Sequence, residues 1–105
     1  DNSGNIITNI IEGSAKDINL RITSTDYIEN LIKGNAFYIS FSNLQTNDIS
    51  IDVLNSMGNR VAYKNKLVNQ RTPQKIDIDN LVTGVYYIKV YAKNKVYVQR
   101  VFITN

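Results

Sequence analysis

Residues 81–91 read Leu-Val-Thr-Gly-Val-Tyr-Tyr-Ile-Lys-Val-Tyr, and this stretch decides the fold. Gly84 can adopt the positive φ that a sharp turn requires. The residues that follow it are all β-branched or aromatic apart from Lys89, which is the composition that strands favour. A Leu-x-x-Gly-x-Tyr pattern at the start of a late strand is also typical of the tyrosine corner of β-sandwiches, in which a tyrosine hydroxyl bonds to the backbone just upstream. The stretch therefore predicts a strand that begins at Gly84 and a corner formed by Tyr86.

This predicted strand has two faces, because successive side chains of a strand point to opposite sides. The side chains expected to face the core are those of Tyr86, Ile88 and Val90. Those expected to face outward are Tyr87, Lys89 and Tyr91, and Tyr97 is expected beside them, across the turn at residues 93–95. Outward tyrosines on a flat sheet can stack on sugars or on a peptide, or they can simply cover the sheet and pair with cross-strand neighbours. The candidate binding stripe is therefore Tyr87, Lys89, Tyr91 and Tyr97.

The rest of the chain is expected to form short strands separated by turns. Apolar or alternating segments occupy residues 6–11, 18–22, 36–41, 49–53, 60–64, 76–78 and 96–103, and in the last of these Val101 and Ile103 are expected in the core. Gly58 is expected to supply the positive φ of a hairpin turn at residues 55–59. Residues 26–32 fit a strand or a helix. About seven to nine strands predict an all-β chain, an immunoglobulin-like antiparallel β-sandwich, with a barrel as the alternative.

Composition restricts the possible functions. The chain has 105 residues, of which 43% are hydrophobic and 20% charged, as expected of one globular domain spanning residues 1–105. It lacks both cysteine and histidine, which removes the thiol nucleophile and the commonest general base and metal ligand. Asp77 and Asp79 could offer oxygen ligands to Ca²⁺, but two carboxylates on one strand more often form a solvated face. We therefore expect neither an enzyme nor a metal or cofactor site.

Charge and hydropathy restrict the partners and the location. A net charge of +3, spread along the chain, is too small to predict a nucleic-acid partner. The sequence contains no apolar run approaching the roughly 20 residues that span a bilayer. The first residues do not have the pattern of a signal peptide, so an exported protein is expected to have lost that signal.

Three segments carry a family resemblance: residues 49–61 (Ile-Ser-Ile-Asp-Val-Leu-Asn-Ser-Met-Gly-Asn-Arg-Val), 76–81 (Ile-Asp-Ile-Asp-Asn-Leu) and 84–90 (Gly-Val-Tyr-Tyr-Ile-Lys-Val). Together they resemble the carboxy-terminal sorting domains of the type IX secretion system, which are small immunoglobulin-like sandwiches at the end of exported Bacteroidetes proteins. A second resemblance rests on Glu12-Gly13, residues 28–32, residues 34–42 (Gly-Asn-Ala-Phe-Tyr-Ile-Ser-Phe-Ser), the hairpin and the Leu-x-x-Gly-x-Tyr strand. From about residue 10 to residue 103, these elements are similar to small secreted Bacteroidetes proteins, standalone immunoglobulin-like domains of unknown function. Both resemblances imply export, and neither assigns a site.

The sequence thus predicts an exported, non-enzymatic binding or interaction domain with a protein or glycan partner. The alternatives are a type IX sorting domain of a larger cargo and a carbohydrate-binding module. Residues 6–11 are apolar on both faces of the expected strand and carry no charge or proline. Such an edge strand invites pairing with another chain, so a homodimer through this strand is a further expectation.

Overall fold

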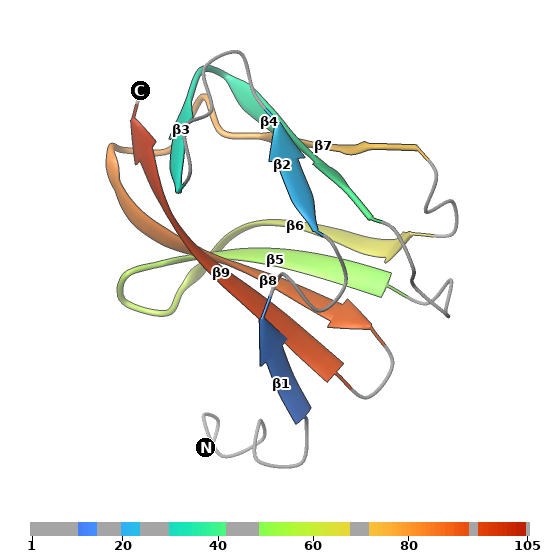
Figure 1. Cartoon of the computed structure of the whole chain (residues 1–105). Coiled ribbons are helices and arrows are strands. Elements are labelled where there is room, and N and C mark those ends of the chain that lie inside the picture. Colours follow the sequence, from blue (N-terminus) through green and yellow to red (C-terminus); the bar gives the residue numbers. More distant parts are fainter. Residues whose placement is uncertain are drawn as a thin grey trace.

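The computed structural model describes residues 11–14, 20–23, 30–41, 49–67, 72–92 and 95–104. These residues form strands packed as two sheets, one above the other, in an immunoglobulin-like β-sandwich (Figure 1). The all-β fold class expected from the sequence is confirmed. No helix in the described ranges has the length and apolar character needed to cross a membrane.

The larger sheet has six strands. Its order is β1 (Ile11–Ser14), β9 (Lys95–Thr104), β8 (Gly84–Ala92), β5 (Ile49–Asn55) and β6 (Arg60–Leu67), and β3 (Leu31–Lys33) also pairs with β9. The smaller sheet has the order β2 (Arg21–Thr23), β4 (Ala36–Ser40) and β7 (Gln74–Asp77). Most neighbouring strands are antiparallel, as the sequence predicted.

Two pairings depart from the expected antiparallel arrangement, because β1 and β3 both run parallel to β9. They lie beside opposite ends of that strand (Figure 1). Parallel neighbours cannot be joined by a tight hairpin, so no local turn pattern in the sequence predicts their pairing.

Of the first expected strand, residues 6–11, the structure describes only Ile11, because residues 6–10 lie outside the described residues. β1 begins at Ile11 and runs to Ser14. Within residues 26–32, only the last three are described, and Leu31 and Ile32 belong to a strand. The predicted homodimer through residues 6–11 therefore stays a prediction.

The hairpin of β5 and β6 follows the sequence prediction, with two shifts of register, one between Ile49 and Ile51 and one between Val53 and Leu54. The Asn55 side-chain oxygen accepts hydrogen bonds from the backbone N–H groups of Met57 and Asn59, both at 2.9 Å. Gly58 has a φ of 89°, which favours glycine. Val53 pairs with Ala62 but Leu54 pairs with Arg60, so β6 contains one extra residue at this point. Such a bulge changes the face to which the next side chain points.

The start of β8 contains the predicted tyrosine corner. The Tyr86 hydroxyl donates a hydrogen bond of 2.5 Å to the backbone oxygen of Val82, four residues upstream. The strand begins at Gly84 as expected, but Gly84 is not among the described residues with positive φ. The corner therefore depends on the tyrosine hydrogen bond, and the predicted special conformation of Gly84 was wrong.

The core fills the space between the two sheets. Along β8 the burial alternates strictly, and Tyr86, Ile88 and Val90 are buried as predicted. Val101 and Ile103 of β9 are buried too, also as predicted. The smaller sheet contributes Ile22, Phe37, Ile39 and Ile76. Packing these side chains removes apolar surface from water, which is the main stabilising term for a sandwich of this size.

Candidate functional site

The candidate site lies on the face of the six-stranded sheet that points away from the smaller sheet, here called the outer face. Strand register and the alternation of side chains assign to it Ser50, Asp52, Leu54, Arg60, Tyr63, Val85, Tyr87, Lys89, Tyr91, Val96, Val98, Arg100 and Phe102. Many of these side chains are aromatic or aliphatic, and all except the buried Asp52 and Val96 are half-buried or exposed. An apolar sheet face of this kind is a candidate interaction surface.

Three members of the predicted stripe lie where the sequence placed them. Tyr87, Lys89 and Tyr91 are half-buried and alternate with the buried side chains of β8. Tyr97 does not join them, because it is only 5% exposed and packs in the core. It pairs with Val90, whose side chain faces inward, and Val96 takes the outer position opposite Tyr91. The expected outward placement of Tyr97 was therefore wrong.

One end of the outer face contains a hollow of about 310 Å³, lined by Ser50, Asp52, Arg60, Tyr63 and Tyr91. Arg60 Nε lies 3.2 Å from Asp52 Oδ1, and the Arg60 guanidinium carbon lies 4.7 Å from the centre of the Tyr63 ring. An ion pair and a cation–π contact thus hold one arginine in a defined position.

The extra residue in β6 creates this arrangement. In a regular hairpin Val61 would oppose Leu54, and Arg60 would point to the other side of the sheet. The shift between Val53 and Leu54 instead brings Arg60 to the outer face, on the same side as Asp52 and Tyr63. The arginine site is therefore built by a backbone irregularity, a common device next to functional positions.

Asp52 is a buried acid, with a side chain that is 12% exposed. Tyr63 lies opposite it on one neighbouring strand and Lys89 on the other. Arg60 supplies the compensating charge, and the Tyr91 hydroxyl hydrogen-bonds to the same carboxylate. Asp52 is thereby satisfied, as a buried charge must be.

The Tyr91 hydroxyl is expected to hold its proton unusually tightly. Burial raises the pKa of Tyr91, and the Asp52 charge and hydrogen bond raise it further, while Arg60 opposes them. The folded chain thus binds this proton more tightly than the unfolded chain, whose tyrosine pKa is about 10. The Tyr91 contribution to stability is present below about pH 10 and is lost as the pH rises through the folded pKa.

We therefore expect the wild-type chain to lose more stability than Tyr91→Phe as the pH is raised above about 10. The measurement is the free energy of urea unfolding for both proteins at a series of alkaline pH values. Parallel curves for the two proteins would contradict the placement of the Tyr91 hydroxyl beside Asp52.

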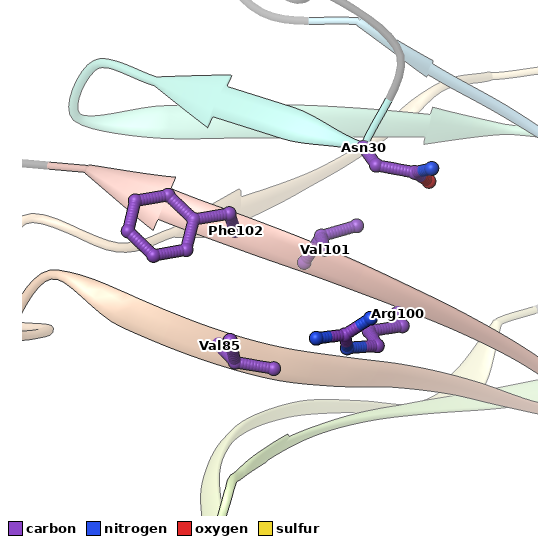
Figure 2. Close-up of a pocket in the computed structure, with 5 residues that line it drawn as sticks. All are labelled: Asn30, Val85, Arg100, Val101 and Phe102. Carbon is purple, nitrogen blue, oxygen red and sulfur yellow. The ribbon is translucent and has the colours of Figure 1, made fainter.

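A second hollow, of about 200 Å³, lies further along the same sheet (Figure 2). Arg100, Val101 and Phe102 contribute to it from β9, Val85 from β8, and Asn30 from the turn before β3. Asn30 has a φ of 69°, and its backbone oxygen accepts a hydrogen bond of 2.7 Å from the Phe102 N–H. The exposed ring of Phe102 and the side chain of Val85 make this hollow more apolar than the first.

The outer face is basic. Strands β3, β5, β6, β8 and β9 place four cations on it, Lys33, Arg60, Lys89 and Arg100, against one acid, Asp52, while Glu12 of β1 pairs with the outer-face residue Val96. Because Asp52 is buried and already paired, the charge presented to a partner is positive. The face therefore suits a partner that combines apolar or aromatic groups with negative charge.

Sequence reasoning identified the tyrosine stripe but missed Asp52, Arg60 and Tyr63 as a group. The alternation of residues 49–53 did indicate that Ser50 and Asp52 face away from the core. The predicted hairpin turn also brought residues 60–64 beside them. What the pattern could not show is the extra residue that turns Arg60 toward Asp52.

Comparison with known proteins supports the assignment of a family. The family model described as "Secretion system C-terminal sorting domain" matches residues 33–104, which include every outer-face residue named above. The chain belongs to the secretion system C-terminal sorting domain family. The relation to type IX sorting domains expected from the sequence is thus confirmed. No curated protein matches the sequence of this chain.

Two solved structures resemble the sorting domain in fold. The BSP domain of a biofilm-associated protein has 20% sequence identity and a TM-score of 0.55, and the match covers 68% of this chain and 12% of that one. This chain therefore spans only a small part of that protein. The sulfur carrier protein SoxY from Chlorobium limicola f thiosulfatophilum has 15% identity and a TM-score of 0.57, and the match covers 98% of this chain and 96% of SoxY. At these identities the likeness shows a shared fold alone.

Proposed function

We propose that this domain is a non-enzymatic sorting module that directs the protein carrying it to export by binding a component of the secretion system. The observation that carries the proposal is the family match over residues 33–104. The outer face supplies a surface for such binding, because it combines half-buried tyrosines with exposed cations and two hollows. Tyrosine and arginine are the residues that most often dominate the energetics of protein interfaces.

The division of the sheet into two faces fits this role. The inner face carries the core, which packs the six-stranded sheet against the smaller sheet. The outer face can therefore present side chains in fixed positions, which lowers the entropy cost of binding. Recognition would then require no large pocket and no bound cofactor.

The proposal is tested by export of a reporter. The chain is fused to the carboxyl end of a fluorescent protein that has its own amino-terminal export signal, and the fusion is expressed in a bacterium with a type IX system. We expect the fused reporter to appear on the cell surface or in the medium, and to remain inside a matched strain that lacks the translocation pore. Equal distribution of the fused and unfused reporters would contradict the proposal.

A carbohydrate-binding module is the second candidate, and the hollow beside Asp52 is the observation that favours it. Tyr63 is 58% exposed next to Asp52 and Ser50, and an aromatic ring beside hydrogen-bonding groups suits a sugar. A glycan array separates the two candidates. Binding of a defined sugar that is lost in Tyr63→Ala would favour the carbohydrate module.

A further inference from the structure

Among the described residues, β6 is the last strand on its side of the six-stranded sheet. The strand order places β6 beside β5, and within the described ranges no strand pairs with its other side. The backbone N–H and C=O groups on such an edge can pair with an extended segment of another chain. The edge is therefore a possible docking element, and its charges indicate what could dock there.

β6 is basic along its length. Its sequence, Arg-Val-Ala-Tyr-Lys-Asn-Lys-Leu, contains three cations and no acid. Two copies of β6 paired edge to edge would bring like charges close together, which destabilises a strand pair. An acidic segment would instead place opposite charges across the new pair. The charge pattern thus favours an acidic partner over a second copy of this chain.

The hollow beside Asp52 lies at this same edge, because Arg60 and Tyr63 both belong to β6. The Arg60 side chain is 55% exposed, although its contacts with Asp52 and Tyr63 hold it in place. Its ion pair with Asp52 is made through Nε, which leaves N–H groups of the terminal nitrogens for an incoming ligand. A guanidinium held in this way is suited to bind a carboxylate through two parallel hydrogen bonds.

We propose that the β6 edge binds an extended acidic segment of a partner protein by strand addition, and that Arg60 binds one carboxylate of that segment in the hollow. This inference rests on the proposed function, since it names the kind of segment that the sorting domain recognises. The added strand extends the sheet, and its alternate side chains point to the same side as the outer face. There they meet Arg60 and the exposed ring of Tyr63 on β6. Lys89 lies on β8, which is separated from β6 by β5.

The buried acid does not prevent this binding. Asp52 is compensated by Arg60 and by the Tyr91 hydroxyl, so it presents little uncompensated charge. Lys64, the next cation along β6, is exposed and adds positive charge to the edge. An incoming carboxylate therefore meets an excess of cations.

The probe for this inference is a blocked, fluorescently labelled peptide of alternating glutamate and threonine, which favours an extended conformation. Fluorescence anisotropy measures its affinity for the full chain, and a peptide with glutamine in place of glutamate is the matched control. We expect the glutamate peptide to bind and the glutamine peptide to bind at least about tenfold more weakly. Arg60→Gln is expected to weaken binding of the glutamate peptide by a similar factor.

Two further variants keep the test independent of folding. Arg60→Lys keeps a positive charge beside Asp52 but lacks the planar pair of donors, so we expect weaker binding by a folded protein. Arg21→Gln removes an exposed arginine from β2 of the other sheet and is expected to leave binding unchanged. In wild-type protein, peptide binding is expected to slow amide hydrogen exchange along β6, as strand addition requires.

Several results would overturn the inference. They are equal affinity of wild type and Arg60→Gln, protection of amides on another strand in place of β6, and tighter binding of an oligosaccharide of uronic acids than of the peptide. Reporter export is measured in parallel. If Arg60→Lys and Arg60→Gln lose the peptide but still export the reporter, the acidic-segment inference fails and the proposed sorting function stands. If these variants lose both peptide binding and reporter export, the acidic-segment inference and the proposed sorting function are both supported.

Discussion

Tyr86→Ala is expected to lower the free energy of unfolding by about 3–5 kcal/mol, which is the usual cost of deleting a buried aromatic side chain. Tyr86 is 3% exposed and packs in the core between the two sheets. Its hydroxyl also bonds to the backbone oxygen of Val82 and so fixes the chain where it enters β8. The substitution removes the ring and the hydrogen bond together and leaves a cavity.

Tyr86→Phe separates these two contributions. The ring stays in the core and only the hydrogen bond to Val82 is lost, so we expect a loss of about 1 kcal/mol. Equilibrium unfolding in urea, followed by circular dichroism, measures both variants against wild type.

The adjacent Tyr87→Ala is the matched control. Tyr87 lies on the outer face, where it supports no core packing, and its substitution is expected to change stability by about 0.5 kcal/mol or less. Similar losses for Tyr86→Ala and Tyr87→Ala would show that the two tyrosines do not face opposite sides of β8.

Much of the fold could be predicted because its signals are local. The alternation in residues 85–91 assigned the two faces of β8, and the Leu-x-x-Gly-x-Tyr pattern predicted the corner bond of Tyr86. The turn at residues 55–59 predicted the hairpin of β5 and β6, including the positive φ of Gly58. In each case the residues that determine the structure are close together in the sequence.

The features that could not be predicted depend on distant or irregular pairing. The parallel pairing of β1 and β3 with β9 joins segments far apart in the chain and leaves no local pattern. Tyr97 is a different case, because alternation from Val101 and Ile103 puts it on the core side, but apolar residues on both faces of residues 96–103 obscured that alternation. Arg60 reaches Asp52 only through the extra residue in β6, which the periodicity of the sequence does not reveal.

The second large effect is expected at the outer face. Substituting both Tyr87 and Tyr91 by alanine removes two large aromatic side chains from the proposed binding surface, and a few such residues commonly carry most of the energy of an interface. Tyr91 also borders the hollow that holds Arg60. We therefore expect the double variant to remain folded and to lose partner binding and reporter export.

Tyr38→Ala is the control for this double variant. Tyr38 is 41% exposed on β4 and lies between the buried residues Phe37 and Ile39, so it points away from the core on the smaller sheet. Its loss removes an exposed tyrosine without changing the outer face of the six-stranded sheet. Unfolding curves for all the variants establish that each protein is folded before export is compared.

We propose that the outer face of the six-stranded sheet is the surface through which this sorting domain acts. The most direct test of this claim is export of the fused reporter by wild type, Tyr38→Ala and the Tyr87→Ala, Tyr91→Ala double variant. The claim predicts normal export by wild type and Tyr38→Ala, and export by the folded double variant that is no greater than that of the unfused reporter. Normal export by the folded double variant would contradict it.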